Sequence, residues 1–350
     1  MKKEFVIIEQ VKGKEEMKEA VLWEKKNGKV RCVLCNHFCL IEEGKTGICG
    51  VRLNKNGVLY SLVYGKTVAE NVDPIEKKPL FHFLPGSLAY SIATVGCNFF
   101  CSFCQNSEIA HPPKNGEIFY TNQTTPEKIV KSALSSGCKS ISYTYTEPTV
   151  FFELAFDTAK IAKENGIKNN FVTNGYMSKE ALKIISPFLD GANVDLKGDE
   201  DFYKKLCGAK QKPVIENISF MKELGIWVEV TTLIVPEYND SEKQIEEIAK
   251  TIKNIDISIP WHVTRFYPAY KMADHYPPSV EKIKRAREIG LEIGLKYVYT
   301  GNLWSDEGEN TYCPSCHKLL IERSGFSILR NNIKEGKCVF CSEKIDGVFK

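Results

Sequence analysis

The distribution of cysteine constrains this chain more than any other feature, since 11 of its 13 cysteines lie in three short clusters. In a reducing compartment closely spaced thiols stay unpaired, so metal ligation explains the clusters better than a disulfide framework. The other two, Cys138 and Cys207, we interpret as small buried hydrophobic residues with no role in a site. The clusters are Cys32, Cys35, Cys39 and Cys49; Cys97, Cys101 and Cys104; and Cys313, Cys316, Cys338 and Cys341.

Charge and hydropathy argue against two classes of partner. The chain has 47 basic and 44 acidic residues, a balance that gives no strong field for nucleic acid or for an anionic membrane. The apolar run at residues 5–8 is too short for the core of a signal peptide, and no stretch approaches the roughly 18 apolar residues of a membrane span. We therefore expect a cytoplasmic protein with neither partner.

The clusters also divide the chain into three parts. At 350 residues it is too long for one ordinary compact domain, unless that domain is an α/β barrel with additions. We expect an N-terminal cysteine-cluster segment at 1–88, a region of alternating strands and helices at 89–305, and a four-cysteine module at 306–350. No long linker separates them, so the parts are expected to pack together.

The middle part predicts an α/β fold. Apolar runs rich in β-formers alternate with stretches of helical periodicity that begin at Ser or Thr-Pro and end at Gly, which is typical of a parallel sheet. Periodicity leaves an open sheet and a complete or partial barrel equally possible. The predicted strands are 89–96, 140–148, 169–175, 191–198, 227–236, 260–268 and 297–301, and the predicted helices are 125–137, 149–166, 178–189, 213–225, 241–254 and 279–294.

Polar residues stand where several of these strands end. The carboxyl ends of parallel strands meet at one edge of the fold, which is where α/β proteins carry their sites. Each residue alone is equally compatible with a solvated loop, but five strands that end in this way favour a site. The residues are Cys97, Glu147, Thr173, Asn174, Asp195, Lys197, Arg265 and Tyr267.

The middle cysteine cluster supplies three thiolates and leaves a fourth coordination position open. That suits a 4Fe-4S cluster with one unique iron better than structural zinc, whose sites usually have four protein ligands. An open iron can chelate the amino and carboxylate groups of S-adenosylmethionine (SAM). The stretch CNFFCSFC (97–104) resembles the CxxxCxxC signature of the radical SAM superfamily, including the aromatic residue Phe103 before the third cysteine.

Three further stretches resemble the pyruvate formate-lyase activating enzymes of that superfamily. TYTEP (144–148) stands where the superfamily has Gly-Gly-Glu-Pro, which implies that Glu147 accepts a hydrogen bond from the SAM amine. DLK (195–197) implies that Lys197 meets the SAM carboxylate, a match of opposite charges. VTNG (172–175) is similar to Asp-Thr-Asn-Gly, but Val172 replaces the aspartate, which argues against a bound monovalent cation. The implied cofactor-binding residues are Phe103, Thr146, Glu147, Thr173, Asn174, Asp195 and Lys197.

Over almost its whole length the chain resembles the radical SAM family of the AmmeMemoRadiSam system. The stretches that carry this resemblance include RCVLCNHFCLIEEGKTGICGVR (31–52), PLFHFLPGS (79–87) and VYTGNLWSDEGENTYCPSC (298–316). The resemblance implies a partial (β/α)6 TIM-like barrel and Memo-like and AMMECR-like proteins as partners. Tyr267 stands where this family commonly has a histidine.

The implied activity is reductive cleavage of SAM to methionine and a 5′-deoxyadenosyl radical, which abstracts hydrogen from a partner protein or peptide. The electron would come from a donor such as flavodoxin or ferredoxin. A small metabolite as substrate is the alternative, and a metal-rich scaffold or electron carrier is disfavoured because it needs no SAM pocket. No catalytic side chain is assigned. His262, Arg265 and Tyr267 either orient the substrate or belong structurally to the last barrel strands.

The two outer clusters each supply four thiols. Cys313-x2-Cys316 and Cys338-x2-Cys341 form two knuckles that predict a zinc ribbon, with rubredoxin-like iron as the alternative. Cys32, Cys35, Cys39 and Cys49 suit a second zinc or an auxiliary iron-sulfur cluster equally well. His37 lies inside that loop, and we interpret it as a solvated histidine in preference to a ligand.

Overall fold

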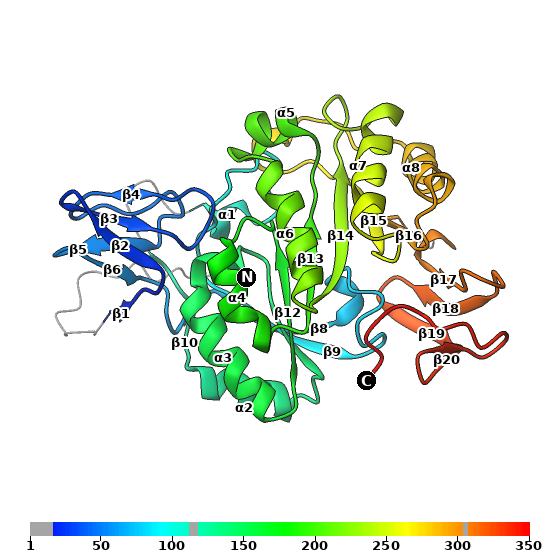
Figure 1. Ribbon diagram of the computed structural model, residues 1–350, viewed down its shortest axis with the longest axis horizontal. Helices are drawn as coiled ribbons and strands as arrows, with labels where there is room; N and C mark the ends of the chain where they lie inside the picture. The colour runs from blue at the N-terminus through cyan, green and yellow to red at the C-terminus, as the bar shows by residue number, and fades with distance from the viewer. Residues whose placement is uncertain (1–16, 112–117, 304–306) are drawn as a thin grey trace.

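The computed structural model describes residues 17–111, 118–303 and 307–350. The apolar run at residues 5–8 and the predicted boundary between residues 305 and 306 lie outside these ranges. Most of the described chain forms one eight-stranded sheet with helices along its outer face, flanked by two small β-rich parts on opposite sides (Figure 1). Within the described residues, every helix is too short or too polar to cross a lipid bilayer.

The large sheet has the strand order β16-β15-β14-β13-β12-β11-β9-β8. All pairs from β9 to β16 are parallel, and only β8 pairs antiparallel with its neighbour β9. Since β8 and β16 lie at the two edges, the sheet is open, as a partial barrel requires. The strands are β8 (Ala69–Pro74), β9 (Leu88–Ala93), β11 (Ser140–Tyr143), β12 (Lys168–Thr173), β13 (Gly191–Asp195), β14 (Trp227–Ile234), β15 (Trp261–Arg265) and β16 (Val298–Gly301).

A helix connects each parallel strand to the next, which gives six β–α units and a seventh parallel strand. Every predicted strand and helix of the middle part overlaps an observed one, so the predicted α/β fold is confirmed. Most strand residues are buried, as expected for a parallel sheet with both faces covered. The helices are α2 (Pro126–Ser135), α3 (Phe152–Glu164), α4 (Lys179–Ile185), α6 (Lys212–Glu223), α7 (Glu242–Ile255) and α8 (Val280–Ile293).

Side chains fix where these helices begin. The hydroxyl oxygens of Thr125, Ser178, Ser241 and Ser279 accept a hydrogen bond from a backbone N–H in the first turn of α2, α4, α7 and α8, respectively. Shorter helical turns follow the carboxyl ends of three strands. They are α1 (Ser107–Ala110), the 3₁₀ turn Pro148–Phe151, and α5 (Glu200–Phe202) with the π-helical turn Tyr203–Cys207.

The N-terminal part consists of two three-stranded antiparallel sheets, β1-β6-β5 and β2-β3-β4. It is anchored to the barrel by the buried ion pair between Arg52 and Glu153 on α3, with an Nη1–Oε1 distance of 3.0 Å. The strands are β1 (Lys18–Glu19), β2 (Trp23–Lys26), β3 (Lys29–Cys32), β4 (Leu40–Ile41), β5 (Arg52–Lys55) and β6 (Val58–Ser61); β7 (Lys66–Thr67) pairs separately with β10 (Asn122–Gln123).

The C-terminal part packs against the amino end of the large sheet. Arg323 Nη2 donates to the carbonyl oxygen of Phe81 at 2.9 Å, and His82 Nδ1 hydrogen-bonds Asp346 O at 2.7 Å. One buried cluster contains residues of the barrel, such as Tyr297 and Tyr299, and residues of the C-terminal part, such as Leu320. The C-terminal part therefore shares its core with the barrel. Its strands are β17 (Thr311–Tyr312), β18 (Leu319–Ser324), β19 (Ser327–Asn331), β20 (Ile333–Lys334) and β21 (Lys337–Cys338).

Candidate active site

A pocket opens at the carboxyl end of the parallel strands. Its wall brings together side chains that follow β9, β11, β12 and β13, four strands that are neighbours in the sheet. All ten residues that the sequence predicted for the cluster and for SAM lie in this wall. They are Cys97, Cys101, Phe103, Cys104, Thr146, Glu147, Thr173, Asn174, Asp195 and Lys197.

The loop that carries the three cysteines begins at a glycine. Gly96 has a φ of +99°, and a Cβ there would lie 2.7 Å from Val51 and 3.0 Å from the carbonyl oxygen of Cys49. Glycine is therefore required where β9 passes the N-terminal part. The loop is held from the other side by Phe100 N, which donates to Cys207 O at 2.9 Å, and by Ser102 N, which donates to Leu206 O at the same distance.

The three thiols differ in their surroundings. Burial raises the pKa of Cys97 well above its ordinary value, and the nearby carboxylate of Glu147 raises it further. The pKa of Cys101 is lowered, because the thiol of Cys207 hydrogen-bonds to it and Lys197 is close. Burial raises the pKa of Cys104 to about 11. Metal coordination deprotonates such thiols outright, so three inward-facing sulfurs suit a metal cluster.

Glu147 presents a buried carboxylate to the pocket. Its side chain is 1 % exposed and accepts hydrogen bonds from Thr149 N (3.0 Å), Thr149 Oγ1 (2.5 Å), Thr173 Oγ1 (2.8 Å) and Asn174 N (2.8 Å). No ion pair among residues 17–111, 118–303 and 307–350 involves Glu147. Burial raises its pKa above the ordinary value despite these hydrogen bonds. A buried carboxylate that lacks a cation suits a positively charged ligand.

Lys197 supplies the cation of the pocket. Its Nζ lies 2.7 Å from Asp195 Oδ2 and 5.7 Å from the centre of the Phe103 ring. Burial alone would lower the pKa of Lys197, but the negative charges of Asp195, Cys101 and Cys207 together outweigh burial and raise the pKa well above its ordinary value. Lys197 therefore stays protonated, and a ligand carboxylate would find a fixed positive charge there.

Sequence reasoning missed a second polar group in the same wall. Lys78 is 2 % exposed, and its Nζ lies 2.7 Å from Asp73 Oδ2 and 3.4 Å from Tyr145 OH. Burial lowers the pKa of Lys78 to about 8. Tyr145 also donates to Asp73, and its backbone φ of +63° is uncommon for a residue with a side chain. The only hint of this group in the sequence was the lysine pair directly before Pro79. It gave no indication of a contact with Tyr145, which is far away along the chain.

Sequence reasoning also missed two residues at the cysteine loop, Asn98 within it and Cys207 next to it. Cys207, interpreted as an inert buried thiol, lies against Cys101. Asn98 is 1 % exposed; its Oδ1 accepts a hydrogen bond from Asn174 Nδ2 at 2.7 Å and lies 3.9 Å from Cys97 Sγ. Neither contact has a local sequence pattern, because each depends on how distant segments pack.

The four C-terminal cysteines converge on one point. The Sγ atoms of Cys313 and Cys341 lie 3.6 Å apart, those of Cys316 and Cys338 lie 3.8 Å apart, and all four lie within 4.8 Å of one another. A zinc ion about 2.3 Å from four sulfurs in a tetrahedron sets them about 3.8 Å apart. The arrangement therefore fits a single tetrahedral metal ion.

The four N-terminal cysteines also share a site. Cys32, Cys35, Cys39 and Cys49 line one small pocket, together with His37, Arg52 and Asn98. His37 points its Nε2 at the carbonyl oxygen of Asn98, 2.8 Å away, and packs against Tyr176. His37 is thus half-buried and partnered, so its interpretation as a solvated loop histidine is wrong.

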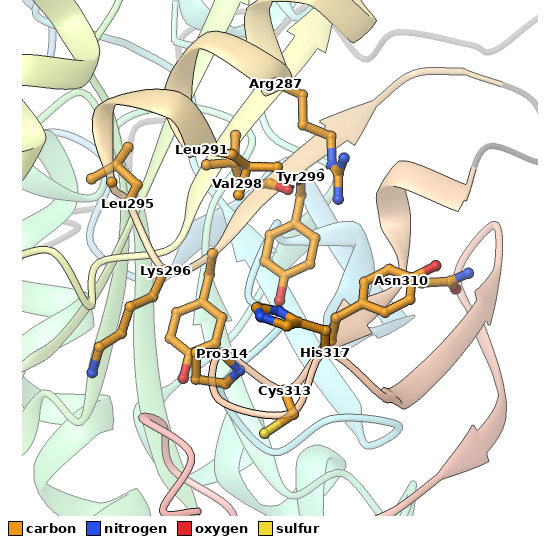
Figure 2. Close-up of a pocket in the computed structure, with 13 residues that line it drawn as sticks. Arg287, Leu291, Leu295, Lys296, Val298, Tyr299, Asn310, Cys313, Pro314 and His317 are labelled. Carbon is orange, nitrogen blue, oxygen red and sulfur yellow. Dashed lines mark hydrogen bonds between the residues drawn. The ribbon is translucent and has the colours of Figure 1, made fainter.

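The remaining predicted residues lie apart from the pocket wall. Arg265 Nε donates to Pro278 O at 2.8 Å, and Tyr267 OH donates to Asn302 O at 3.1 Å. His262 is 2 % exposed near the amino end of the sheet, where it hydrogen-bonds Glu229. A separate groove lies at that end, between α8 and the C-terminal part, and Figure 2 shows Arg287, Tyr299 and His317 among its lining residues. Of the predicted site residues, only Cys313 borders this groove.

Comparisons with known proteins show what this chain is similar to. A family model described as "Radical SAM superfamily" matches residues 91–252. The "Uncharacterized protein MJ0808" of Methanocaldococcus jannaschii is 48% identical over 334 residues, which cover 94% of this chain and 99% of that protein. The "Putative glycyl-radical enzyme activating enzyme MJ1632" of the same organism is 28% identical over 207 residues, 58% of this chain and 76% of that protein.

Among solved structures, the chain is similar to Streptococcus suis SuiB. The TM-score is 0.50 at 17% sequence identity, over 66% of this chain and 52% of that one. At this identity the likeness concerns the fold alone.

Proposed function

Because this chain belongs to the radical SAM superfamily and is an enzyme of that family, we propose that its pocket binds a 4Fe-4S cluster and SAM. Cys97, Cys101 and Cys104 are the proposed ligands of three irons, which leaves the fourth iron open to SAM. The single observation that carries the proposal is the composition of one pocket wall: three thiols, a buried carboxylate without a cation, and a protonated lysine.

The residues of the wall match the charges of SAM. Within the described residues, Oε2 of Glu147 accepts only one hydrogen bond, from Asn174 N. This oxygen is the proposed acceptor for the SAM ammonium. Lys197 is the proposed partner of the SAM carboxylate, with Asp195 fixing its position. The binding surface is completed by Phe103, Thr146, Thr173 and Asn174. All four side chains are buried, which helps to keep water away from the ligand.

When bound at Cys97, Cys101 and Cys104, a reduced cluster would supply the electron for reductive cleavage of SAM to methionine and a 5′-deoxyadenosyl radical, which would abstract hydrogen from the substrate. The protein contributes binding, orientation and exclusion of water. We assign no general acid or base, since forming the radical requires no proton transfer. The electron donor is proposed to be a low-potential cytoplasmic protein such as flavodoxin or ferredoxin.

The substrate we propose is a protein or peptide. A relative of this chain carries the name of a glycyl-radical enzyme activating enzyme, whose substrate is a protein. Beside the cysteine loop, the ring of His111 stacks between Phe100 and Tyr270, at centroid distances of 5.6 and 5.0 Å. Phe100 and Tyr270 are 45 % and 43 % exposed. Exposed aromatic side chains next to a reactive pocket suit a polypeptide surface.

We also propose zinc at Cys313, Cys316, Cys338 and Cys341. The spacing of their sulfurs supports a single ion, and the small β17–β21 module buries little apolar surface of its own, so a bound metal would hold its turns together. Strands β17–β20 lie on the far side of the barrel from the N-terminal strands (Figure 1), so the role proposed for this ion is structural.

The chemistry is tested with anaerobically reconstituted protein under strong reductant. We expect 5′-deoxyadenosine and methionine from SAM, and no product from the variant with Cys97→Ala, Cys101→Ala and Cys104→Ala. Cys138→Ala, which removes a buried thiol outside the clusters, serves as the control and should retain activity. Cleavage of SAM by the triple variant would contradict the proposed cluster site.

The substrate is tested by incubating the active enzyme with purified Memo-like and AMMECR-like proteins, followed by mass spectrometry of each protein. A mass change, or a glycyl or other protein radical detected by electron paramagnetic resonance, is the expected result. Phe100→Ser and Tyr270→Ser should lower modification at least tenfold and leave substrate-free SAM cleavage unchanged. If both variants modified the protein as fast as the wild type does, the proposed docking surface would be refuted. Turnover of a small metabolite, with no change in any protein, would refute the proposal of a protein substrate.

A further inference from the structure

We propose that Cys32, Cys35, Cys39 and Cys49 hold a second iron-sulfur cluster, of the 4Fe-4S type, and that it exchanges electrons with the site of Cys97, Cys101 and Cys104. The first statement concerns metal binding alone. The second rests on the proposed function, because it requires a cluster at Cys97.

The four thiols surround an enclosed space. All of them line the same pocket, whose other walls include the apolar side chains of Leu34, Ile41 and Val150. Cys32 and Cys49 are 6 % and 8 % exposed, and Leu34 and Ile41 are 2 % exposed each. Four thiols directed into one dry pocket supply the complete ligand set of a cubane cluster and leave no iron open to an outside ligand.

The spacing of the thiols distinguishes a cluster from a single ion. Among the described residues, which include all 13 cysteines, only the C-terminal four form a group whose ligand atoms all lie within 4.8 Å. No three of the N-terminal thiols meet that limit, and neither do Cys97, Cys101 and Cys104. A single zinc draws its sulfurs to about 3.8 Å. A four-iron cluster holds them farther apart, because each thiolate binds a different iron.

Two buried donors point to sulfur acceptors in this pocket. Arg52 is 2 % and Asn98 1 % exposed, and both line the space between the cysteines. Arg52 Nε has no hydrogen-bond partner within the described part of the chain; Asn98 Nδ2 has none among the nitrogen and oxygen atoms there, and the Asn98 side chain lies within hydrogen-bonding reach of the Cys35 thiol. A buried donor without a partner costs free energy, so such atoms indicate an absent acceptor. The thiolate and sulfide sulfurs of a cluster are acceptors of this kind.

The two cysteine sites adjoin each other. Cys97 Sγ lies 3.9 Å from the side chain of Asn98, which belongs to the N-terminal pocket. The backbone of Cys49 passes so close to Gly96 that a Cβ there would come within 3.0 Å of the Cys49 carbonyl oxygen. Asn98 follows Cys97 directly in the chain and its side chain reaches the thiol of Cys35, so this residue connects the two cysteine sites.

This arrangement provides a path for electrons into the catalytic pocket. A low-potential one-electron donor protein reduces the N-terminal cluster, and that electron passes to the cluster at Cys97, which leaves the first cluster oxidised. No bond is formed or broken and no proton moves in this step. The C-terminal site has no comparable contact and, as a single closed ion, takes no part.

Metal analysis of the triple variant Cys97→Ala, Cys101→Ala and Cys104→Ala tests the second cluster. After anaerobic reconstitution the wild type should contain about eight iron atoms and eight sulfides per chain, and the triple variant about four of each. Additional replacement of Cys35 and Cys39 by Ala should remove the remaining iron, whereas additional Cys138→Ala should not. Two zinc ions and no iron in the triple variant would overturn the proposal.

Electron paramagnetic resonance of the fully reduced protein tests the contact between the clusters. Two neighbouring paramagnetic clusters broaden and split each other's signals, so the wild-type spectrum should differ from the sum of the spectra of the triple variant and of the double variant Cys35→Ala and Cys39→Ala. A wild-type spectrum equal to that sum would refute electron exchange through Asn98. A wild type that holds both clusters but does not cleave SAM would refute the proposed function and leave the second cluster intact.

Discussion

The two ends of the large sheet each bury a glutamate, and the two differ in what surrounds the carboxylate. At the carboxyl end, Glu147 accepts four hydrogen bonds but has no cationic partner within the described residues. At the amino end, Glu229 accepts hydrogen bonds from Phe81 N, His82 N and Trp227 Nε1, and His262 Nε2 lies 2.8 Å from its Oε2. Glu147 borders an open pocket, whereas Glu229 is fully enclosed.

The same difference appears in the pKa values. Burial raises the pKa of Glu147, and its hydrogen bonds do not compensate. Burial also acts to raise the pKa of Glu229, but the hydrogen bonds of His262 and Trp227 and the charges of His262 and His82 together outweigh it, so the pKa of Glu229 lies below its ordinary value. The carboxylate at the amino end is thus satisfied by the protein itself, which indicates a structural role. The carboxylate at the carboxyl end is completed only by a ligand.

The largest effect is expected from removing the metal at the amino end. Cys341 is exposed, so Cys341→Ala removes a ligand without opening a cavity in the core. The variant should lose about one zinc per chain, and β17–β21 should lose protection from hydrogen exchange, because structural zinc contributes on the order of 10 kcal/mol in small modules. Val339→Ala, in the same turn, is the control and should keep the metal.

The carboxyl end should not respond to this change. Iron content and SAM affinity of Cys341→Ala should equal those of the wild type, since no side chain among the described residues 307–350 lines the proposed SAM pocket. Iron in place of zinc at this site would contradict the metal assignment. Loss of SAM binding with the iron-sulfur clusters intact would show that the two ends are coupled.

The second largest effect is expected from Glu229→Ala. The substitution leaves His262 and the backbone amides of Phe81 and His82 buried without an acceptor, which should cost about 3–5 kcal/mol of unfolding free energy. Chemical denaturation measures this loss, and the exposed Glu223→Ala should change stability by less than about 0.5 kcal/mol. A loss of SAM affinity without a loss of stability would reverse the roles that we assign to the two glutamates.

A smaller effect, on binding alone, is expected at the carboxyl end. Glu147→Gln and Lys197→Met each remove one charged contact with SAM, which corresponds to about 1.5–3 kcal/mol, or roughly a tenfold to hundredfold loss of affinity. Iron content should not change, because neither side chain is a proposed cluster ligand. Calorimetry with SAM under anaerobic conditions checks this, with the exposed Glu180→Gln as the control. Unchanged affinity in both variants would mean that SAM binds elsewhere.

The sequence predicted the carboxyl end of the sheet better than the amino end. The site residues there follow directly on strands, so the alternation of strands and helices was enough to bring Cys97, Glu147 and Lys197 to one edge. The contact of Lys78 with Tyr145 joins residues 67 positions apart and has no periodic signal. Cys207 and Asn98 were missed for the same reason.

At the amino end, the roles of side chains depend on packing between distant segments. The apolar pattern correctly predicted the strands that contain Glu229 and His262. Glu229, however, hydrogen-bonds the backbone of residues 81–82 as well as His262, and no local pattern links residues 81–82 to β14 or β15. The C-terminal metal module was predicted from its two Cys-x2-Cys pairs, since a short spacing fixes a metal site locally. That it shares its core with the barrel through Tyr297 and Tyr299 required the structure.

The smallest expected effect is on the pH dependence of stability, and its sign should differ between the two glutamates. Glu229 has a lowered pKa in the folded state, so its ionised form stabilises the fold above its unfolded pKa of about 4.3, and this contribution is lost as pH falls through the folded pKa. Glu147 has a raised folded pKa, so its ionised form costs stability at neutral pH, and that cost disappears as pH falls.

Replacement by glutamine removes each titration. Relative to the wild type, Glu147→Gln should therefore gain stability as pH rises above the unfolded pKa of about 4.3, whereas Glu229→Gln should lose stability as pH rises toward that value and stay constant above it. Urea denaturation of the two variants and the wild type, at matched metal content and without SAM, measures both differences. Added SAM should abolish the gain of Glu147→Gln, because the ligand ammonium then stabilises the wild-type carboxylate. If the stability difference from the wild type changed in the same direction with pH for both variants, the two buried carboxylates would have equivalent surroundings.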